Sequence, residues 1–121
     1  MESQLEFFKQ VVKKLLSEYE SQKSEWTEVE LVFDDQRRSY LVMQVGWHKE
    51  ERYHSCLVHI DIRNGKIVIQ ENNTEDLLDE ELVALGIPTD KIYLGLIPPA
   101  AHNFLRNATR KMRVHQELEP A

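Results

Sequence analysis

Two side chains that could do chemistry together, His59 and Asp61, stand two residues apart in an extended run of the chain. Residues at this spacing share one face of a strand, so the imidazole and the carboxylate could begin a metal site. Zinc sites use three or four protein ligands, and no Cys-x-x-Cys, His-x-x-x-His or His-Glu-x-x-His spacing supplies the others. We therefore interpret the pair as polar residues beside a hairpin, and we predict no metal site and no cofactor.

The motifs that would make this chain a nuclease are missing from its sequence. A restriction-type nuclease places an acidic residue two positions before a lysine, so that carboxylates hold Mg²⁺ beside the attacking water. None of the eight lysines has an acidic residue at that spacing, and the four glycines are isolated rather than grouped in a phosphate-binding loop. We predict that the chain has no catalytic residues and is not an enzyme.

The His59 and Asp61 pair belongs to a β-hairpin that is turned at Asn64-Gly65. This dipeptide between two β-rich runs is a strong signal for a two-residue type I′ turn, because both central positions need positive φ. A one-residue slip would exchange the two faces of the hairpin. The predicted pairs on the isoleucine face are Ile62 with Ile67, Ile60 with Ile69 and Val58 with Glu71. On the other face they are Arg63 with Lys66, Asp61 with Val68 and His59 with Gln70.

Hydrophobic periodicity places the hairpin in an α+β fold. It predicts an N-terminal helix over 4–20, then a four-stranded antiparallel meander over 28–34, 40–47, 52–63 and 66–71. In the second strand, the side chains predicted to point inward are Leu41, Met43, Val45 and Trp47. A second helix is predicted after Thr74 and stops at Gly86 and Pro88. The segment 92–97 forms a fifth strand or an extended segment, and a short C-terminal helix lies in a basic extension over 100–121.

Length and composition favour a single domain over 1–121. A chain of this size can bury about two thirds of its unfolded surface without a metal or a disulfide. Cys56 falls on the apolar face of its strand, which indicates a small core residue. Gly46, inside the second strand, indicates a bulge, a close backbone approach or a plain packing need. With no bilayer-spanning run and no signal-peptide pattern at Met1, we expect a cytoplasmic protein that does not contact a membrane.

Charge is divided unevenly along the chain. Residues 1–98 carry 11 Lys and Arg against 19 Asp and Glu, a net charge of −8, whereas residues 99–121 carry 4 against 2, a net charge of +2. Duplex DNA is held by clustered positive charge, so the acidic body is a poor candidate for wrapping DNA. Direct DNA binding, or a weak or indirect contact with nucleic acid, would depend on the basic residues of the C-terminal helix, Arg106, Arg110, Lys111 and Arg113.

The second face of the predicted sheet is more apolar than a freely solvated face needs. Its members are Tyr40, Val42, Tyr53, Leu57 and Val68, interspersed with His59 and Asp61. Aromatic and aliphatic groups with a few polar neighbours are typical of a protein interface. We therefore expect this face to form a homo-oligomer or to dock a companion protein, unless a helix of the same chain covers it.

Segments spread over most of the chain match one known family. They include Val45-Gly46-Trp47, His59-Ile60-Asp61-Ile62 and Leu94-Gly95-Leu96-Ile97-Pro98-Pro99. On these segments the chain resembles the XisI proteins of cyanobacteria, the excision controlling factors of the fdxN element. The resemblance implies an accessory role in programmed DNA excision with a companion protein, XisH, and it implies no catalytic residues. The chain departs from the family pattern at His102, where the family has Arg, and it continues to Ala121.

These observations give one function hypothesis and two alternatives. The hypothesis is a non-catalytic accessory factor of DNA-element excision that binds an XisH-like companion. The first alternative is a DNA-binding module that uses the basic C-terminal helix, and it predicts strong loss of affinity with added salt. The second is a small metal-dependent hydrolase built on His59 and Asp61, and it requires further ligands and a pocket beside them.

Overall fold

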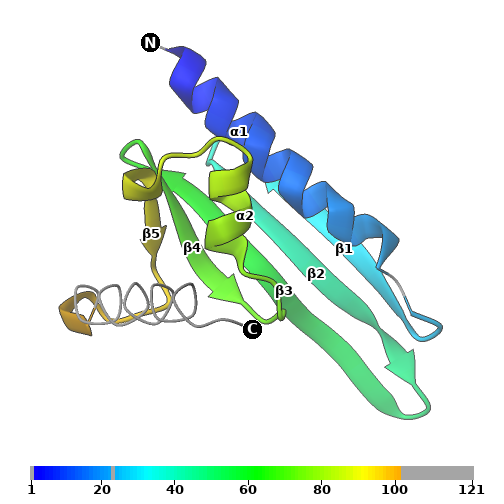
Figure 1. Cartoon of the computed structure of the whole chain (residues 1–121). Coiled ribbons are helices and arrows are strands. Elements are labelled where there is room, and N and C mark those ends of the chain that lie inside the picture. The colour runs from blue at the N-terminus through cyan, green and yellow to red at the C-terminus, as the bar shows by residue number, and fades with distance from the viewer. Residues whose placement is uncertain (1, 23, 102–121) are drawn as a thin grey trace, which may run out of the picture.

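The computed structural model describes residues 2–22 and 24–101. Its five strands form one sheet in the order β1-β2-β3-β4-β5, in which β1 to β4 are an antiparallel meander and β5 runs parallel to β4 (Figure 1). The predicted α+β fold is confirmed, and the segment after the second helix forms a short strand. In chain order the elements are α1 (Glu2–Ser17), η1 (Glu18–Ser21), β1 (Thr27–Asp34), β2 (Ser39–His48), β3 (Glu51–Arg63), β4 (Lys66–Asn72), α2 (Leu78–Ala84), η2 (Thr89–Lys91), β5 (Ile92–Leu94) and η3 (Pro99–Ala101).

The turn between β3 and β4 has the predicted geometry. Asn64 and Gly65 adopt φ values of 52° and 74°, as a type I′ turn requires. Four predicted pairs are confirmed: Ile62 with Ile67, Ile60 with Ile69, Asp61 with Val68, and Arg63 with Lys66. The two pairs farthest from the turn are wrong, because a bulge between His59 and Ile60 inserts Gln70 as an extra residue. Val58 therefore pairs with Asn72, and His59 pairs with Glu71.

A second irregularity lies between β2 and β3. Val42 pairs with Val58 and Met43 pairs with Cys56, so Leu57 is the extra residue of a bulge. The prediction of which β2 side chains point inward is wrong, because the buried ones are Tyr40 and Val42, both 0% exposed. Leu41, Met43, Val45 and Trp47 point to the opposite face. Cys56, predicted as a core residue, is half-buried and pairs with Met43 on that opposite face.

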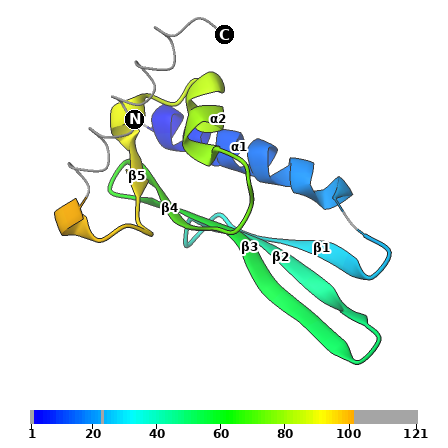
Figure 2. The ribbon, with the colours of Figure 1, turned by 60° about the horizontal axis from the view of Figure 1, so that its bottom comes forward.

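Both helices lie on the same side of the sheet (Figure 2). The helix predicted over 4–20 is found as α1 and η1, and its side chains Phe8, Val12, Leu15 and Leu16 are all at most 3% exposed. They pack on strand residues of one sheet face, and full burial of each such side chain contributes about 1.5–3 kcal/mol. The buried strand residues of this core are Tyr40, Val42, Val58, Ile60, Ile62, Ile67, Ile69 and Ile92.

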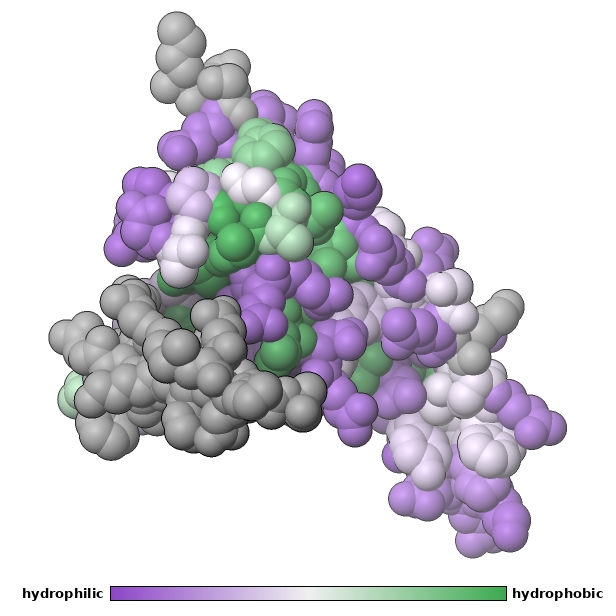
Figure 3. Space-filling model, in the orientation of Figure 1, coloured by the Kyte–Doolittle hydropathy of each residue, from purple (hydrophilic) through white to green (hydrophobic). Residues whose placement is uncertain are grey.

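The helix α2 is shorter than predicted. Leu78 and Leu82 are buried, but the helix begins at Leu78 rather than directly after Thr74. The Thr74 hydroxyl instead accepts the Asp76 backbone N–H in a turn before the helix. Gly86, at φ 105°, follows the helix end, as its position predicted. Around α2, hydrophobic side chains reach the surface among hydrophilic ones (Figure 3).

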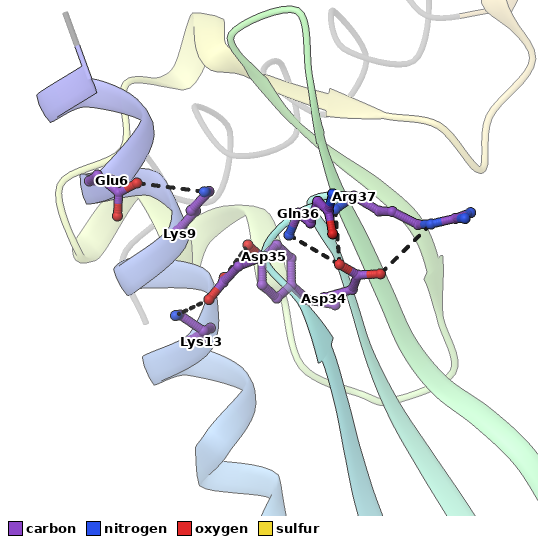
Figure 4. A network of polar contacts seen from close by, with 8 residues as sticks. Glu6, Lys9, Lys13, Asp34, Asp35, Gln36 and Arg37 are labelled. Atoms are coloured by element: carbon purple, nitrogen blue, oxygen red, sulfur yellow. Dashed lines mark hydrogen bonds and ion pairs between the residues drawn. The ribbon is translucent and has the colours of Figure 1, made fainter.

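A network of polar side chains ties the β1–β2 turn to α1 (Figure 4). Lys13 on α1 donates to one carboxylate oxygen of Asp35 at 2.9 Å, and the Tyr40 hydroxyl donates to the other at 2.8 Å. These hydrogen bonds, that from Lys13 first, lower the pKa of the Asp35 carboxyl. Asp34 closes the turn itself by accepting the backbone N–H groups of Gln36 and Arg37.

The predicted C-terminal helix lies outside the described residues beyond Ala101, and so do Arg106, Arg110, Lys111 and Arg113. In the described part of the chain, no helix combines the length and the apolar character that crossing a membrane requires.

Candidate functional site

The face of the sheet that is turned away from α1 and α2 is the candidate site, and we call it the open face (Figure 2). Paired residues share a face, so the register assigns each strand side chain to one side. Val32 and Trp47 on this face are 47% and 57% exposed. Leu41, Met43 and Val45 between them are half-buried. The apolar side chains of the open face on β1 and β2 are thus Val32, Leu41, Met43, Val45 and Trp47.

The structure divides the residues predicted for a single docking face between the two faces. Tyr40 and Val42 are 0% exposed in the core. Leu57 packs against that core, and the half-buried Tyr53 pairs with Gly46 on the same side as the helices. His59, Asp61 and Val68 do lie on the open face. The bulge at Leu57 places Tyr53 on the helix side, since an extra residue reverses the alternation on one side of it. Tyr40 and Val42 lie in the core because they pair with Ile60 and Val58.

A polar cluster centred on Asp61 lies on the open face near the β3–β4 turn. Asp61 is only 1% exposed. Its Oδ1 lies 2.8 Å from Nε2 of His59, and its Oδ2 lies 2.9 Å from an Arg63 guanidinium nitrogen and accepts from the Gln70 amide at 3.2 Å. Ser39, its partner on β2, also hydrogen-bonds to the carboxylate. Four side chains therefore enclose one carboxylate on the side of the sheet without helices.

This cluster keeps Asp61 ionised. Burial raises the pKa of the Asp61 carboxyl, but the hydrogen bonds from Ser39, His59 and Gln70 outweigh burial and hold the pKa below its usual range. Both carboxylate oxygens are already engaged by donors. Among the residues described, no three His, Cys, Asp or Glu side chains are grouped so that they could hold a metal ion. The predicted proximity of His59 and Asp61 is found, and in this structure it forms a hydrogen-bonded network.

The low pKa of Asp61 predicts a specific loss of stability in acid. Asp61→Asn is expected to lower the free energy of unfolding at pH 7 by about 1–3 kcal/mol, because it removes hydrogen bonds to a buried charge. A carboxyl whose folded pKa is depressed contributes stability above its unfolded pKa of about 3.9, and that stability is lost as the pH falls through the folded pKa. Urea denaturation from pH 7 down to pH 2 measures the difference.

In that experiment the wild-type advantage over Asp61→Asn should shrink as the pH falls below about 4. Asp90→Asn, which changes an exposed carboxyl in η2, is the matched control and should follow the wild-type curve. A constant difference between wild type and Asp61→Asn down to pH 2 would contradict the assignment.

An aromatic cluster occupies the end of the sheet that extends past the helices (Figure 1). The rings of Trp26 and His48 are in contact at a tilt of 47°, with centroids 4.1 Å apart, and the Arg52 guanidinium lies 5.2 Å from the centre of the Trp47 ring. Gly46 permits this arrangement, because the Trp26 carbonyl oxygen lies where a Cβ on Gly46 would be. Of the interpretations offered for Gly46, the close backbone approach is confirmed. Sequence reasoning missed the cluster by placing Trp47 in the core.

Cys56 is not arranged as a nucleophile. Its thiol donates to the Val58 carbonyl at 3.3 Å. Burial first, and then the neighbouring Glu71 carboxylate, raise the pKa of the Cys56 thiol to about 11. The thiol is therefore protonated at neutral pH, where the reactive thiolate form is scarce.

These features define a small α+β protein in which two helices cover one face of a mixed sheet and the other face carries apolar side chains beside a closed polar network. A family model described as "XisI protein" matches residues 1–109, so the chain belongs to the XisI family. Membership supports a role in element excision, since the family includes a protein described as an excision controlling factor.

Two solved structures from Anabaena variabilis ATCC 29413 are similar to this chain. A XisI-like protein is 41% identical, with a TM-score of 0.74 over 78% of this chain and 88% of that chain. The fdxN element excision controlling factor XisI is 26% identical, with a TM-score of 0.70 over 80% of this chain and 96% of that chain. No curated protein matches the chain.

Proposed function

We propose that this protein is a non-catalytic accessory factor of programmed DNA-element excision, and that it acts by binding an XisH-like companion protein through the open face of its sheet. The observation that carries the proposal is the apolar surface of that face. A solvated strand face ordinarily carries polar side chains. On β2 the open face instead carries an unbroken apolar series, which is Leu41, Met43, Val45 and Trp47.

The composition of the open face supports protein docking. Trp47 is 57% exposed with Arg52 over its ring, and tryptophan and arginine are enriched among the residues that dominate binding energy at interfaces. Glu28 and Glu30 are exposed along the edge strand β1 beside the apolar series. An apolar centre with a charged edge is the usual anatomy of an interface between two proteins.

The reactive groups on the same face support an accessory role. The Asp61 carboxylate is engaged by four side chains, and the Cys56 thiol is protonated at neutral pH. Groups held in this way stabilise the shape of the face rather than transfer protons or attack a substrate. In this proposal, bond cleavage during excision is carried out by another polypeptide.

Two valines with nearly equal exposure on opposite sides of the molecule test the proposal. Val32 is 47% exposed on the open face, and Val83 is 43% exposed on α2. Val32→Glu and Trp47→Ala are each expected to weaken binding of an XisH-like protein from the same genome by about tenfold or more, because an interface residue of this kind contributes over 1 kcal/mol. Isothermal titration calorimetry measures the dissociation constants.

Val83→Glu adds the same charge to the helix side and should leave the affinity unchanged. Circular dichroism should show that all three variants are folded. The proposal fails if the wild-type chain does not bind the XisH-like protein, or if Val83→Glu weakens binding as much as Val32→Glu does. A mass measurement that finds only a complex between copies of this chain would also overturn it.

A further inference from the structure

We infer that the C-terminal segment 102–121 of this chain docks into a groove between α2 and β5, which we call the α2–β5 groove. The groove has a volume of about 160 Å³. The residues that matter for the argument are Ile69 and Leu94 on the sheet, Leu77 and Leu96 at the rim, and Asp76 and Asp79 beside α2. The inference is independent of companion binding, because the groove lies on the side of the sheet that carries the helices.

The apolar rim of the groove is left uncovered by the described residues around it. Leu77 is 59% exposed and Leu96 is 50% exposed, while Leu78 and Ile69 below them are at most 2% exposed. The space-filling view shows hydrophobic side chains at the surface in this region around α2 (Figure 3). Two exposed leucines beside an apolar floor favour an occupant that is itself partly apolar.

Charge favours the C-terminal segment as that occupant. Residues 74–90, which include α2, contain six Asp and Glu and no Lys or Arg. Residues 102–116 contain four Lys and Arg and no Asp or Glu. Two of the six acidic residues, Asp76 and Asp79, line the groove itself. Opposite charges at the groove and on the segment attract at short range and are weakened by added salt.

The point where the described chain ends also favours this occupant. The segment follows η3, and it begins only six residues after Leu96, which lines the groove. A tether this short gives the segment an effective concentration of about the millimolar order at the groove, so weak contacts suffice. Phe104, Ala108 and Met112 recur at a spacing of four, which would give a helical segment an apolar side to place against the leucines.

Docking of this kind has a consequence for the basic residues of the segment. Arg106, Arg110 and Arg113 would lie near the acidic residues of α2, where their charge is neutralised within the molecule. The segment would then complete the surface of the protein and would not present a positively charged face to duplex DNA.

Paramagnetic relaxation in the full-length chain tests the inference. A nitroxide is placed at position 83 on α2 through Val83→Cys, in a Cys56→Ser background, and amide signals of 102–113 are recorded by NMR. These signals are expected to lose most of their intensity, and 0.5 M salt should restore part of it. A label on β1 through Glu30→Cys, on the open face, is the matched control and should leave them intact.

The double variant Leu77→Asp with Leu96→Asp changes two exposed rim residues, so the fold should persist. It is expected to restore the attenuated signals with the label at position 83. The inference is overturned if the label at 83 leaves 102–113 unaffected, if the label at 30 attenuates these signals instead, or if the double variant does not change the attenuation.

Discussion

Val42→Asp is expected to prevent the chain from folding at neutral pH. Val42 is 0% exposed, and it pairs with Val58 under the helices. A carboxylate at this position would be surrounded by the apolar core and would have no cation to pair with. Burial of such a charge costs several kcal/mol at least, which is comparable with the total stability of about 5–15 kcal/mol of a small domain. Loss of the near-ultraviolet circular dichroism and of a cooperative urea transition would show the effect.

The neighbouring residue provides the matched control. Met43 is half-buried on the open face, so Met43→Asp should remain folded and lose only about 1 kcal/mol. Under the proposed function it should also weaken companion binding, since the new charge enters the middle of the apolar series. If Met43→Asp unfolds while Val42→Asp folds, the two faces of β2 are exchanged relative to this structure.

The elements of the fold were predictable because their signals are local. A type I′ turn needs positive φ at two residues, and Asn64 and Gly65 both adopt it. The predicted register therefore holds for the strand pairs nearest the turn. Phe8, Val12 and Leu15 recur at the helical spacing that predicted the N-terminal helix, and all three are buried. In each case, residues close in sequence carry the whole signal.

The faces of β2 and of β3 before Leu57 were predicted wrongly, because bulges leave no local mark and the alternation in β2 fits either face. Leu57 and Gln70 are ordinary strand residues, yet each is the extra residue in its ladder. Alternation in β2 is also ambiguous, since Tyr40 and Val42 are as apolar as Leu41 and Met43. The choice between these two sets is made by pairing with β3, where Ile60 and Val58 set the core side.

In the candidate site, too, the contact with a local sequence signal was predicted and the contacts that depend on strand pairing were not. The two-residue spacing of His59 and Asp61 indicated correctly that their side chains meet. The burial of Asp61 was not indicated, because two of its other partners come from neighbouring strands. Arg63 lies on β3 two residues after Asp61, but Ser39 is on β2 and Gln70 is on β4, and only the register brings these two to the carboxylate.

Gly46→Ala is expected to lower the free energy of unfolding by about 3 kcal/mol, because it forces backbone apart at the pair where the ladder between β1 and β2 begins. The added Cβ would lie 2.0 Å from the Trp26 carbonyl oxygen and 2.8 Å from the Cα of Thr27. Neither atom belongs to a side chain that could rotate away. Separation would also weaken the hydrogen bond from the Trp47 N–H to the Trp26 carbonyl, now 3.2 Å, and disturb the contact between the Trp26 and His48 rings. The midpoint of urea denaturation measures the loss.

Gly95→Ala makes the same chemical change where the neighbours are side chains. A Cβ there would lie 2.8 Å from Oε1 of Gln70 and 2.9 Å from Cγ1 of Val68. The Gln70 side chain can rotate away and the branched Val68 has less freedom, so the expected loss is about 1 kcal/mol, below that at Gly46. Where the backbone permits it, replacing glycine by alanine stabilises a protein by about 0.4–1 kcal/mol, because it lowers the conformational entropy of the unfolded chain. At Gly46 the clash with the Trp26 carbonyl must outweigh this gain. Equal losses at the two positions would show that the close approach of Trp26 to Gly46 does not determine stability.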